Sequence, residues 1–349
     1  MAIAEPKRVW NPPNPYLSEH RELLGEAPAV ELEVYEDQSK SILSENDSPD
    51  LGFRFSVNPY RGCMHACAYC YARPSHQYLG FGAGTDFDRE IVVKVNAPEL
   101  LREAFQRRSW AGELIVFSGN TDCYQPVEAT YQLTRKCLEV CLEHRQPIHV
   151  ITKSALVRRD ADLLARLAKD ARASVTLSIP FADAEMARAI EPYAPSPAAR
   201  FETVRRLANL GVRVSVNVAP VIPGLNDPQI SEIVGRAAEA GARSLALIPL
   251  RLPAEVLPVF FQRLREAYPA RVDKVGSALV QIRRGKLNDP AFGARMVGSG
   301  PRWAAIEALF RVKCRQAGLA THDEPDALGN DAAAPTTFRR PTRQQRLFV

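Results

Sequence analysis

The chain is organised around the stretch Asn58-Pro59-Tyr60-Arg61-Gly62-Cys63-Met64-His65-Ala66-Cys67-Ala68-Tyr69-Cys70-Tyr71-Ala72-Arg73. Its three cysteines, Cys63, Cys67 and Cys70, have the spacing C-x3-C-x2-C, so one short loop can surround a soft metal centre. Cysteine thiolates are the usual ligands of iron–sulfur clusters. Ferredoxin-type motifs bring a fourth cysteine, which this stretch lacks. A four-iron cluster held here would keep one iron open for chemistry, as a catalytic zinc does when it lacks a protein ligand.

Two other interpretations of the cysteines are open. A structural zinc ion could bind the three thiolates together with His65 or His76, although zinc modules usually pair two short ligand hooks and no second hook is evident. The thiols could also be buried and unreactive, although three within eight positions are unusual in a chain with seven cysteines. The spacing favours the iron–sulfur cluster.

Composition indicates a large soluble protein. The chain has 349 residues, of which 46% are hydrophobic, enough for one barrel with extensions. It has no apolar run of about 18 residues and no apolar signal segment at its start, so we expect a cytoplasmic protein with no membrane segment. An odd number of cysteines argues against a complete disulfide framework. The net charge of +5 is compatible with a nucleic-acid partner and equally with a mildly basic enzyme.

Short apolar runs alternate with helical patterns from residue 53 to residue 268. This alternation is typical of a parallel sheet and predicts a partial (β/α)6 barrel, with an open doubly wound sheet as the alternative fold. The expected strands are 53–57, 114–118, 148–152, 174–179, 212–218 and 244–248, and the expected helices between and after them are 130–143, 160–169, 198–210, 228–240 and 253–268.

The chain divides into four parts around this barrel. We expect an N-terminal extension over 1–50, the barrel over 51–270 with the cluster loop at 58–73, and a helical extension over 271–320. Residues 321–349 are rich in Asp, Ala and Pro and end in a basic segment, which predicts a disordered tail.

Polar residues lie where the predicted strands end. The segment Gly119-Asn120-Thr121-Asp122-Cys123 follows the second strand, Lys153 follows the third, and Ser178 and Asn217 lie near the ends of the fourth and fifth. Active sites of parallel barrels lie at the carboxyl ends of the strands. These side chains therefore predict a polar ligand in the barrel, unless they hydrogen-bond to one another.

The cysteine motif, with Tyr69 in its aromatic position, resembles the signature of the radical S-adenosylmethionine (SAM) superfamily. The flanking residues Asn58 to Cys63 and Cys70 to His76 resemble the branch related to spore photoproduct lyase, whose members are described as DNA repair photolyase-like. The resemblance runs from about residue 51 to residue 268. It implies a [4Fe–4S] cluster and SAM as cofactors, and reductive cleavage of SAM to a 5′-deoxyadenosyl radical. That radical would abstract hydrogen from an unidentified substrate, for which the branch suggests a DNA lesion.

The resemblance also implies roles for residues. Cys63, Cys67 and Cys70 would bind the cluster. Gly119 to Asp122 stands where most members have Gly-Gly-Glu, a departure that makes Asp122 the candidate for the SAM amino group. The other residues expected to bind SAM are Tyr69 near the adenine, Asn120 beside Asp122, Lys153 at the carboxylate, Ser178 at the ribose, and Asn217 on the adjacent strand.

Cys123 is the expected catalytic residue, as a hydrogen donor at the barrel mouth, because spore photoproduct lyase has such a cysteine near the end of this strand. The alignment puts that cysteine nearer Gly119. The expected electron source is a low-potential donor of the flavodoxin or ferredoxin type. Other functions left open are radical modification of RNA, protein or a small molecule, and a non-enzymatic, zinc-stabilised nucleic-acid-binding protein.

Overall fold

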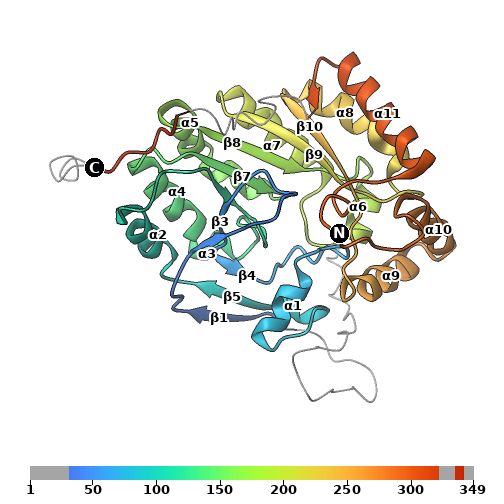
Figure 1. The fold of residues 1–349 in the computed structure, drawn as a ribbon, viewed down its shortest axis with the longest axis horizontal. Coiled ribbons are helices and arrows are strands. Elements are labelled where there is room, and N and C mark those ends of the chain that lie inside the picture. The colour runs from blue at the N-terminus through green and yellow to red at the C-terminus, as the bar shows by residue number, and fades with distance from the viewer. Residues whose placement is uncertain (1–30, 322–334, 342–349) are drawn as a thin grey trace.

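A large, strongly curved sheet forms the centre of the computed structural model, which describes residues 31–321 and 335–341 (Figure 1). Its strand order is β11-β10-β9-β8-β7-β6-β3-β2. All neighbours are parallel except β2, which pairs antiparallel with β3. The strands are β2 (Leu43–Glu45), β3 (Phe55–Val57), β6 (Ile115–Phe117), β7 (Ile148–Thr152), β8 (Ala173–Ser178), β9 (Arg213–Val221), β10 (Ser244–Pro249) and β11 (Ala320–Thr321). Because β11 and β2 form the two edges, the barrel is partial, as the alternation predicts.

Helices connect successive parallel strands and cover the outer face of the sheet (Figure 1). The main ones are α2 (Ala97–Gln106), α4 (Leu133–Glu143), α5 (Ala161–Asp170), α7 (Pro197–Asn209), α8 (Ile230–Glu239) and α9 (Val256–Ala267), with shorter α1 (Thr85–Arg89), α3 (Glu128–Tyr131) and α6 (Ala184–Ile190). Single 3-10 segments are η1 (Arg73–Leu79), η2 (Ala155–Asp160), η3 (Asp227–Gln229) and η4 (Pro269–Arg271). The six predicted strands and five predicted helices are all present with shifted ends, except that the helix predicted over 130–143 is divided into α3 and α4 at Gln132, which has a positive φ of 54°. No helix in the described ranges has the length and apolarity needed to cross a bilayer.

A second, small sheet supports the start of the cysteine loop. It has the order β1-β5-β4, with β1 (Glu33–Asp37) parallel and β4 (Tyr60–Arg61) antiparallel to β5 (Glu90–Lys94). The sequence predicts a short strand near 30–35 within the N-terminal extension, which corresponds to β1, but does not predict β4 or β5. Because β4 leads directly into Cys63, this sheet fixes the point from which the cysteine loop departs.

The C-terminal part adds α10 (Val272–Ile282) and α11 (Gly300–Gln316) before β11. Residues 335–341 then lie against α2 and α4, where the Phe338 ring contacts Phe105 at 5.6 Å between centroids and Arg340 donates to the carbonyl of Trp110 at 3.0 Å. This differs from the disorder expected over 321–349. Residues 322–334 and 342–349 of that tail, and 1–30 of the N-terminal extension, lie outside the described residues.

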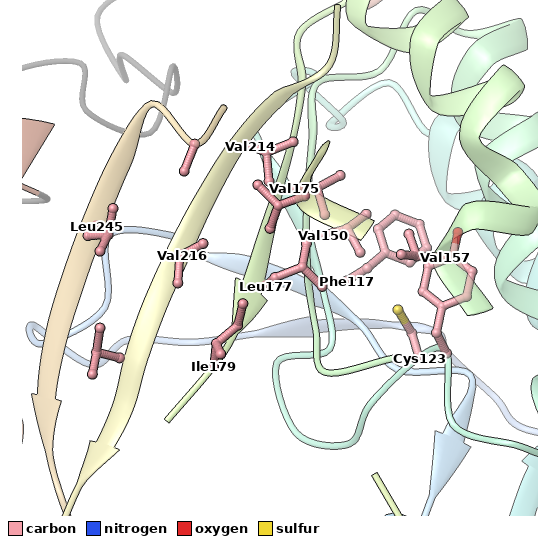
Figure 2. Close-up of a cluster of buried hydrophobic side chains, with 14 of the residues drawn as sticks. Phe117, Cys123, Val150, Val157, Val175, Leu177, Ile179, Val214, Val216 and Leu245 are labelled. Carbon is pink, nitrogen blue, oxygen red and sulfur yellow. The ribbon is translucent and has the colours of Figure 1, made fainter. Parts of the chain in front are cut away.

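The two faces of the parallel strands differ in chemistry. Val175 and Leu177 on one face of β8 belong to the apolar core, which includes leucines of α5 and α7 (Figure 2). Thr176 and Ser178 alternate with them and face the inside of the barrel. Because successive side chains of a strand point to opposite faces, the face of the sheet under the helices is apolar and the face that lines the barrel interior is polar.

Candidate cofactor site

The three cysteines lie on successive turns of one loop that follows β4. Ala66 N donates to the carbonyl of Cys63 and Cys70 N to that of Cys67, each at 3.2 Å. Cys63 and Cys67 are buried, Cys70 is half-buried, and all three are free thiols. Because β3 ends just before this loop, the thiols gather at the carboxyl ends of the parallel strands.

Buried polar side chains hold the loop from two sides. Gln125 accepts from Met64 N and donates to the carbonyl of Gly62, both at 2.9 Å. Arg73 is fully buried, donates to the carbonyl of Cys67 at 3.0 Å and pairs with Asp88 at 2.9 Å. For Arg73 the sequence leaves two roles open, contact with an anion at the mouth or a bridge between loops, and the structure shows the bridge. Gln125 is not identified from the sequence, because its contacts form no part of a periodic pattern.

A third support ties the loop to α6. The hydroxyl of Tyr69 donates to the carboxylate of Glu191, which also accepts from Arg200. All three side chains are buried. Although burial opposes ionisation of Glu191, the Arg200 and Lys153 cations hold the pKa of Glu191 below its usual value. The Tyr69 ring is thus fixed against the loop, and Glu191 and Arg200 complete a site that the motif only partly identifies.

Asp122 joins the end of β6 to the end of β7. One carboxylate oxygen accepts from Thr152 Oγ1 at 2.7 Å and from Tyr124 N at 2.9 Å. The other accepts from Lys153 N at 2.8 Å and lies 3.4 Å from His65 Nδ1. Burial raises the pKa of Asp122, but these partners outweigh it and bring the pKa down to about 2. An ammonium group of SAM would therefore have to share a carboxylate that already orients the strand end.

Asn120 bridges two neighbouring segments. Its backbone N donates to Asn58 Oδ1 at 2.8 Å and its side-chain Nδ2 to Ser75 Oγ at 3.0 Å. The side-chain amide nitrogen therefore points toward η1, and the amide oxygen takes no part in either of these contacts.

A row of polar residues crosses three neighbouring strands: Lys153 directly follows β7, Ser178 is the last residue of β8, and Asn217 lies in the middle of β9. Ser178 and Asn217 are direct partners in the sheet. Lys153 Nζ lies 5.6 Å from the centroid of the Tyr69 ring and forms no ion pair with a described carboxylate. The contact between Lys153 and Tyr69 brings the end of β7 next to the cysteine loop.

Deeper in the lumen the polar groups satisfy one another. His149 Nδ1 lies 2.8 Å from Ser174 Oγ, and Thr176 Oγ1 lies 3.1 Å from His149 Nε2. Ser215 Oγ lies 2.8 Å from Ser244 Oγ. These side chains in the lower part of the lumen are therefore satisfied by one another. A ligand would bind above them, at the row formed by Lys153, Ser178 and Asn217.

Cys123 lies in the apolar core instead of at the predicted mouth. Its side chain has 0% exposure and packs in the cluster with Phe117 and Val157 (Figure 2). Burial raises the pKa of this thiol well above its usual value. The chain turns between Asp122 and Tyr124 and directs the sulfur into the apolar core.

Tyr71 is a mouth residue that sequence reasoning missed. It follows Cys70, its hydroxyl donates to the carbonyl of Gly119 at 3.0 Å, and half of the residue (50%) is exposed. Its position directly after the last cysteine was the only available signal, and that position alone does not show which way the ring points.

The donor set fits an iron–sulfur cluster better than a single metal ion. Within the residues described, no group of three or more His, Cys, Asp or Glu side chains is placed to hold one ion. A four-iron cluster takes one thiolate per iron, so its cysteines surround it and do not converge on a point. Burial raises the pKa of Cys70 to about 11 and raises that of Cys67 well above its usual value, so both thiols need a strongly positive partner to ionise.

The histidines do not complete a zinc site. His65 contacts both Asp122 and Cys63, whereas the His76 ring is enclosed by Phe81 and Phe87, with centroids 5.0 and 5.6 Å away. Among the described side chains, no group of three or more metal-ligating residues is placed around one ion, so nothing in them supports the zinc interpretation.

Comparisons with known proteins agree with this geometry. The family model of the radical SAM superfamily matches residues 57–237. An uncharacterized protein of Mycobacterium tuberculosis is 37% identical over 264 residues, which cover 75% of this chain and 77% of that protein. A "Radical SAM Nalpha-GlyT isomerase" of Pseudomonas phage M6 is 25% identical over 290 residues, covering 82% of this chain and 56% of that protein.

The fold also has solved counterparts. A spore photoproduct lyase mutant with bound AdoMet and dinucleoside spore photoproduct superposes with a TM-score of 0.62 at 18% identity, and the match covers 87% of each chain. At that identity the match establishes a shared fold, including the partial barrel.

Proposed function

The chain belongs to the radical SAM superfamily, and from that membership we propose that it is an enzyme that begins hydrogen abstraction on a nucleotide-containing substrate. One observation supports the proposal: three free cysteines on one loop, two buried and one half-buried, lie at the same end of a parallel sheet as Lys153, which forms no ion pair with a described carboxylate. This arrangement offers ligands for a cluster and a cation for the carboxylate of SAM.

Cys63, Cys67 and Cys70 would hold the [4Fe–4S] cluster, one thiolate to an iron. When bound and reduced by a low-potential donor of the flavodoxin or ferredoxin type, the cluster and SAM supply a carbon-centred radical that abstracts hydrogen. The supports at Gln125, Arg73 and Glu191 keep the loop rigid, so the thiols stay in position without the cofactor.

SAM would bind to the row of polar residues formed by Lys153, Ser178 and Asn217, with contributions from Asn120, Asp122 and Tyr69. Lys153 suits the carboxylate because an ammonium is a compact cation with three donors. Ser178 and Asn217 suit the ribose hydroxyls, and the oxygen of Asn120 suits the amino group. Asp122 would orient Lys153 through its backbone nitrogen and add negative charge for the amino group, while the Tyr69 ring would bound the adenine side.

A nucleotide-containing substrate is supported by two facts. The net charge is +5, and the solved structure of similar fold carries a dinucleoside photoproduct. Charge favours encounter with a polyanion but does not select one. RNA, protein or small-molecule substrates are the alternatives that product analysis would reveal.

The test is anaerobic reconstitution with iron and sulfide, followed by dithionite and SAM and an assay for 5′-deoxyadenosine. We expect deoxyadenosine from the native protein and none from the Cys63/Cys67/Cys70 triple alanine variant. Cys141→Ala is the matched control, because Cys141 is a buried thiol on α4, away from the loop. Zinc binding without a cluster, or equal deoxyadenosine from the triple variant, would overturn the proposal.

A further inference from the structure

A group of exposed arginines surrounds the point where residues 335–341 meet α2 and α4 (Figure 1). Its members come from three separate segments: Arg107 and Arg108 follow α2, Arg145 follows α4, and Arg339 lies in the C-terminal segment. We call this group the arginine patch. Because β6 follows α2 and β7 follows α4, the patch lies at the amino ends of the parallel strands, opposite the cysteine loop.

Hydrogen bonds hold the three segments of the arginine patch together. Arg339 N donates to the carbonyl of His144 at 2.7 Å, and the guanidinium of Arg340 donates to the carbonyl of Arg107, also at 2.7 Å. Arg340 makes its other two hydrogen bonds to backbone carbonyls of the same segment, so no carboxylate offsets its charge. The patch is therefore a fixed part of the surface, with one further positive charge beneath it.

The charges of the arginine patch are not offset by acids of the described chain. No carboxylate among the described residues forms an ion pair with any of its four members. Glu143, at the end of α4, pairs instead with Arg102 at 3.1 Å, and Glu103, one helical turn before Arg107, forms no ion pair with it. Several uncompensated like charges in one area of surface create a positive field, which attracts a polyanion from solution.

The backbone at Arg145 points to a role for its side chain. Arg145 N donates to the carbonyl of Leu142 in the turn that ends α4, and Arg145 has a positive φ of 50°. The same turn ends α7 and α8, where the corresponding residues are Gly211 and Gly241, with φ of 79° and 88°. A side chain is strained in this conformation, whereas glycine is not. Strained residues of this kind gather at functional sites.

The chemistry of the patch narrows the class of polyanion. A guanidinium binds two phosphate oxygens through parallel hydrogen bonds, and contacts to phosphates position a nucleic acid without reading its bases. In sequence the segment from Arg339 continues as Arg-Arg-Pro-Thr-Arg-Gln-Gln-Arg, a basic end without acids that is typical of nucleic-acid-binding arms. We propose that the arginine patch is a second contact surface for nucleic acid, which binds the phosphate backbone independently of sequence, away from the reaction site.

This inference rests on the proposed function, since it takes the substrate to contain nucleotides. The test uses the reconstituted protein and a fluorescein-labelled DNA duplex of mixed sequence, whose binding is followed by anisotropy at several salt concentrations. Arg108→Gln and Arg145→Gly should each weaken binding roughly threefold to tenfold and lower the slope of log K against log salt by about one. The double variant should lower that slope by about two, because each arginine contacts a separate phosphate.

Arg145→Gly separates the charge from the fold. Glycine suits a positive φ, so this variant should melt at the native temperature or above it while it binds the duplex more weakly. The matched control is Arg265→Gln, which removes an exposed arginine from α9, on the other side of the barrel from α2 and α4 (Figure 1). It should leave both affinity and salt slope unchanged.

Competitors and a second assay complete the test. An unlabelled duplex of another sequence should displace the probe as well as the original one does, and polyglutamate should displace it poorly. Absence of duplex binding by the native protein, native affinity and slope in both patch variants, or equal losses in Arg265→Gln would each overturn the surface. Displacement by polyglutamate as effective as by the duplex would indicate an acidic protein partner instead. Deoxyadenosine formation from SAM, measured without duplex on the same preparations, shows any failure of the radical chemistry separately.

Discussion

At the scale of the residue, the site depends on which polar groups are already satisfied. Asp122 accepts from Thr152, Tyr124 and the backbone of Lys153, so its carboxylate mainly orients its neighbours. The ammonium of Lys153 contacts the Tyr69 ring but forms no ion pair with a carboxylate of the described residues. It is therefore the cation on this edge of the sheet that we propose for ligand binding.

Replacing Lys153 should therefore affect SAM and not the cluster. Lys153→Met removes the charged hydrogen bond to the SAM carboxylate, and we expect SAM affinity to fall about tenfold or more. Equilibrium binding of SAM to the reconstituted protein measures this. Lys136→Met, a change on the exposed side of α4, is the control. Loss of iron from Lys153→Met, or unchanged SAM affinity, would contradict the role.

At the scale of the element, the alternation of strands and helices was predictable because each unit carries its own signals. Apolar runs mark β7 and β8, and glycines with positive φ, Gly211 and Gly241, follow α7 and α8. The small β1-β5-β4 sheet was not predictable as a unit, because its pairings join residues far apart in sequence and its strands lie within irregular segments.

The site was predictable only in part, for the same reason. The cysteines and the strand-end residues follow from spacing and fold, whereas Glu191 reaches Tyr69 across 122 positions of sequence. Cys123 shows the limit most clearly. A strand end fixes where a side chain begins, but the turn that follows decides whether it points to the mouth or into the core.

The β7–β8 pair also predicts a pH dependence. Burial lowers the pKa of His149 to about 4, while an unfolded chain has a histidine pKa near 6.5. Between these values the unfolded chain binds a proton that the folded chain excludes, so stability falls as pH drops from about 6.5 toward about 4. This residue accounts for up to about 3 kcal/mol of that loss.

His149→Gln can keep hydrogen bonds to Ser174 and Thr176 without the titration. Its unfolding free energy should fall less steeply over that pH range than that of the native protein. Part of the slope should remain, because burial also lowers the pKa of His76 to about 4. Urea unfolding at a series of pH values measures both slopes, and identical slopes would show that His149 is not the titrating group.

At the scale of the whole molecule, the end of the chain returns to the beginning of the barrel. Thr336 Oγ1 donates to the carbonyl of Gly112 at 2.6 Å, and Thr337 Oγ1 to that of Arg145 at 2.8 Å. These carbonyls precede β6 and β7, so residues 335–341 cover the amino ends of the strands. The cysteine loop lies at the opposite ends, which separates the parts that stabilise the barrel from the part that reacts.

This separation predicts that weakening the C-terminal contact lowers stability without changing chemistry. Phe338→Ala removes a partly buried ring from Phe105 and His144, and we expect a loss of about 2 kcal/mol, seen as a melting temperature several degrees lower. Arg339→Ala, an exposed change in the same segment, should leave the melting temperature unchanged. Deoxyadenosine formation below the melting temperature should be equal in both variants and the native protein, because no catalytic group lies at this end. A Phe338→Ala protein that melts at the native temperature but makes less deoxyadenosine would contradict this prediction. Such a result would show that the amino ends of the strands influence the chemistry at the cysteine loop.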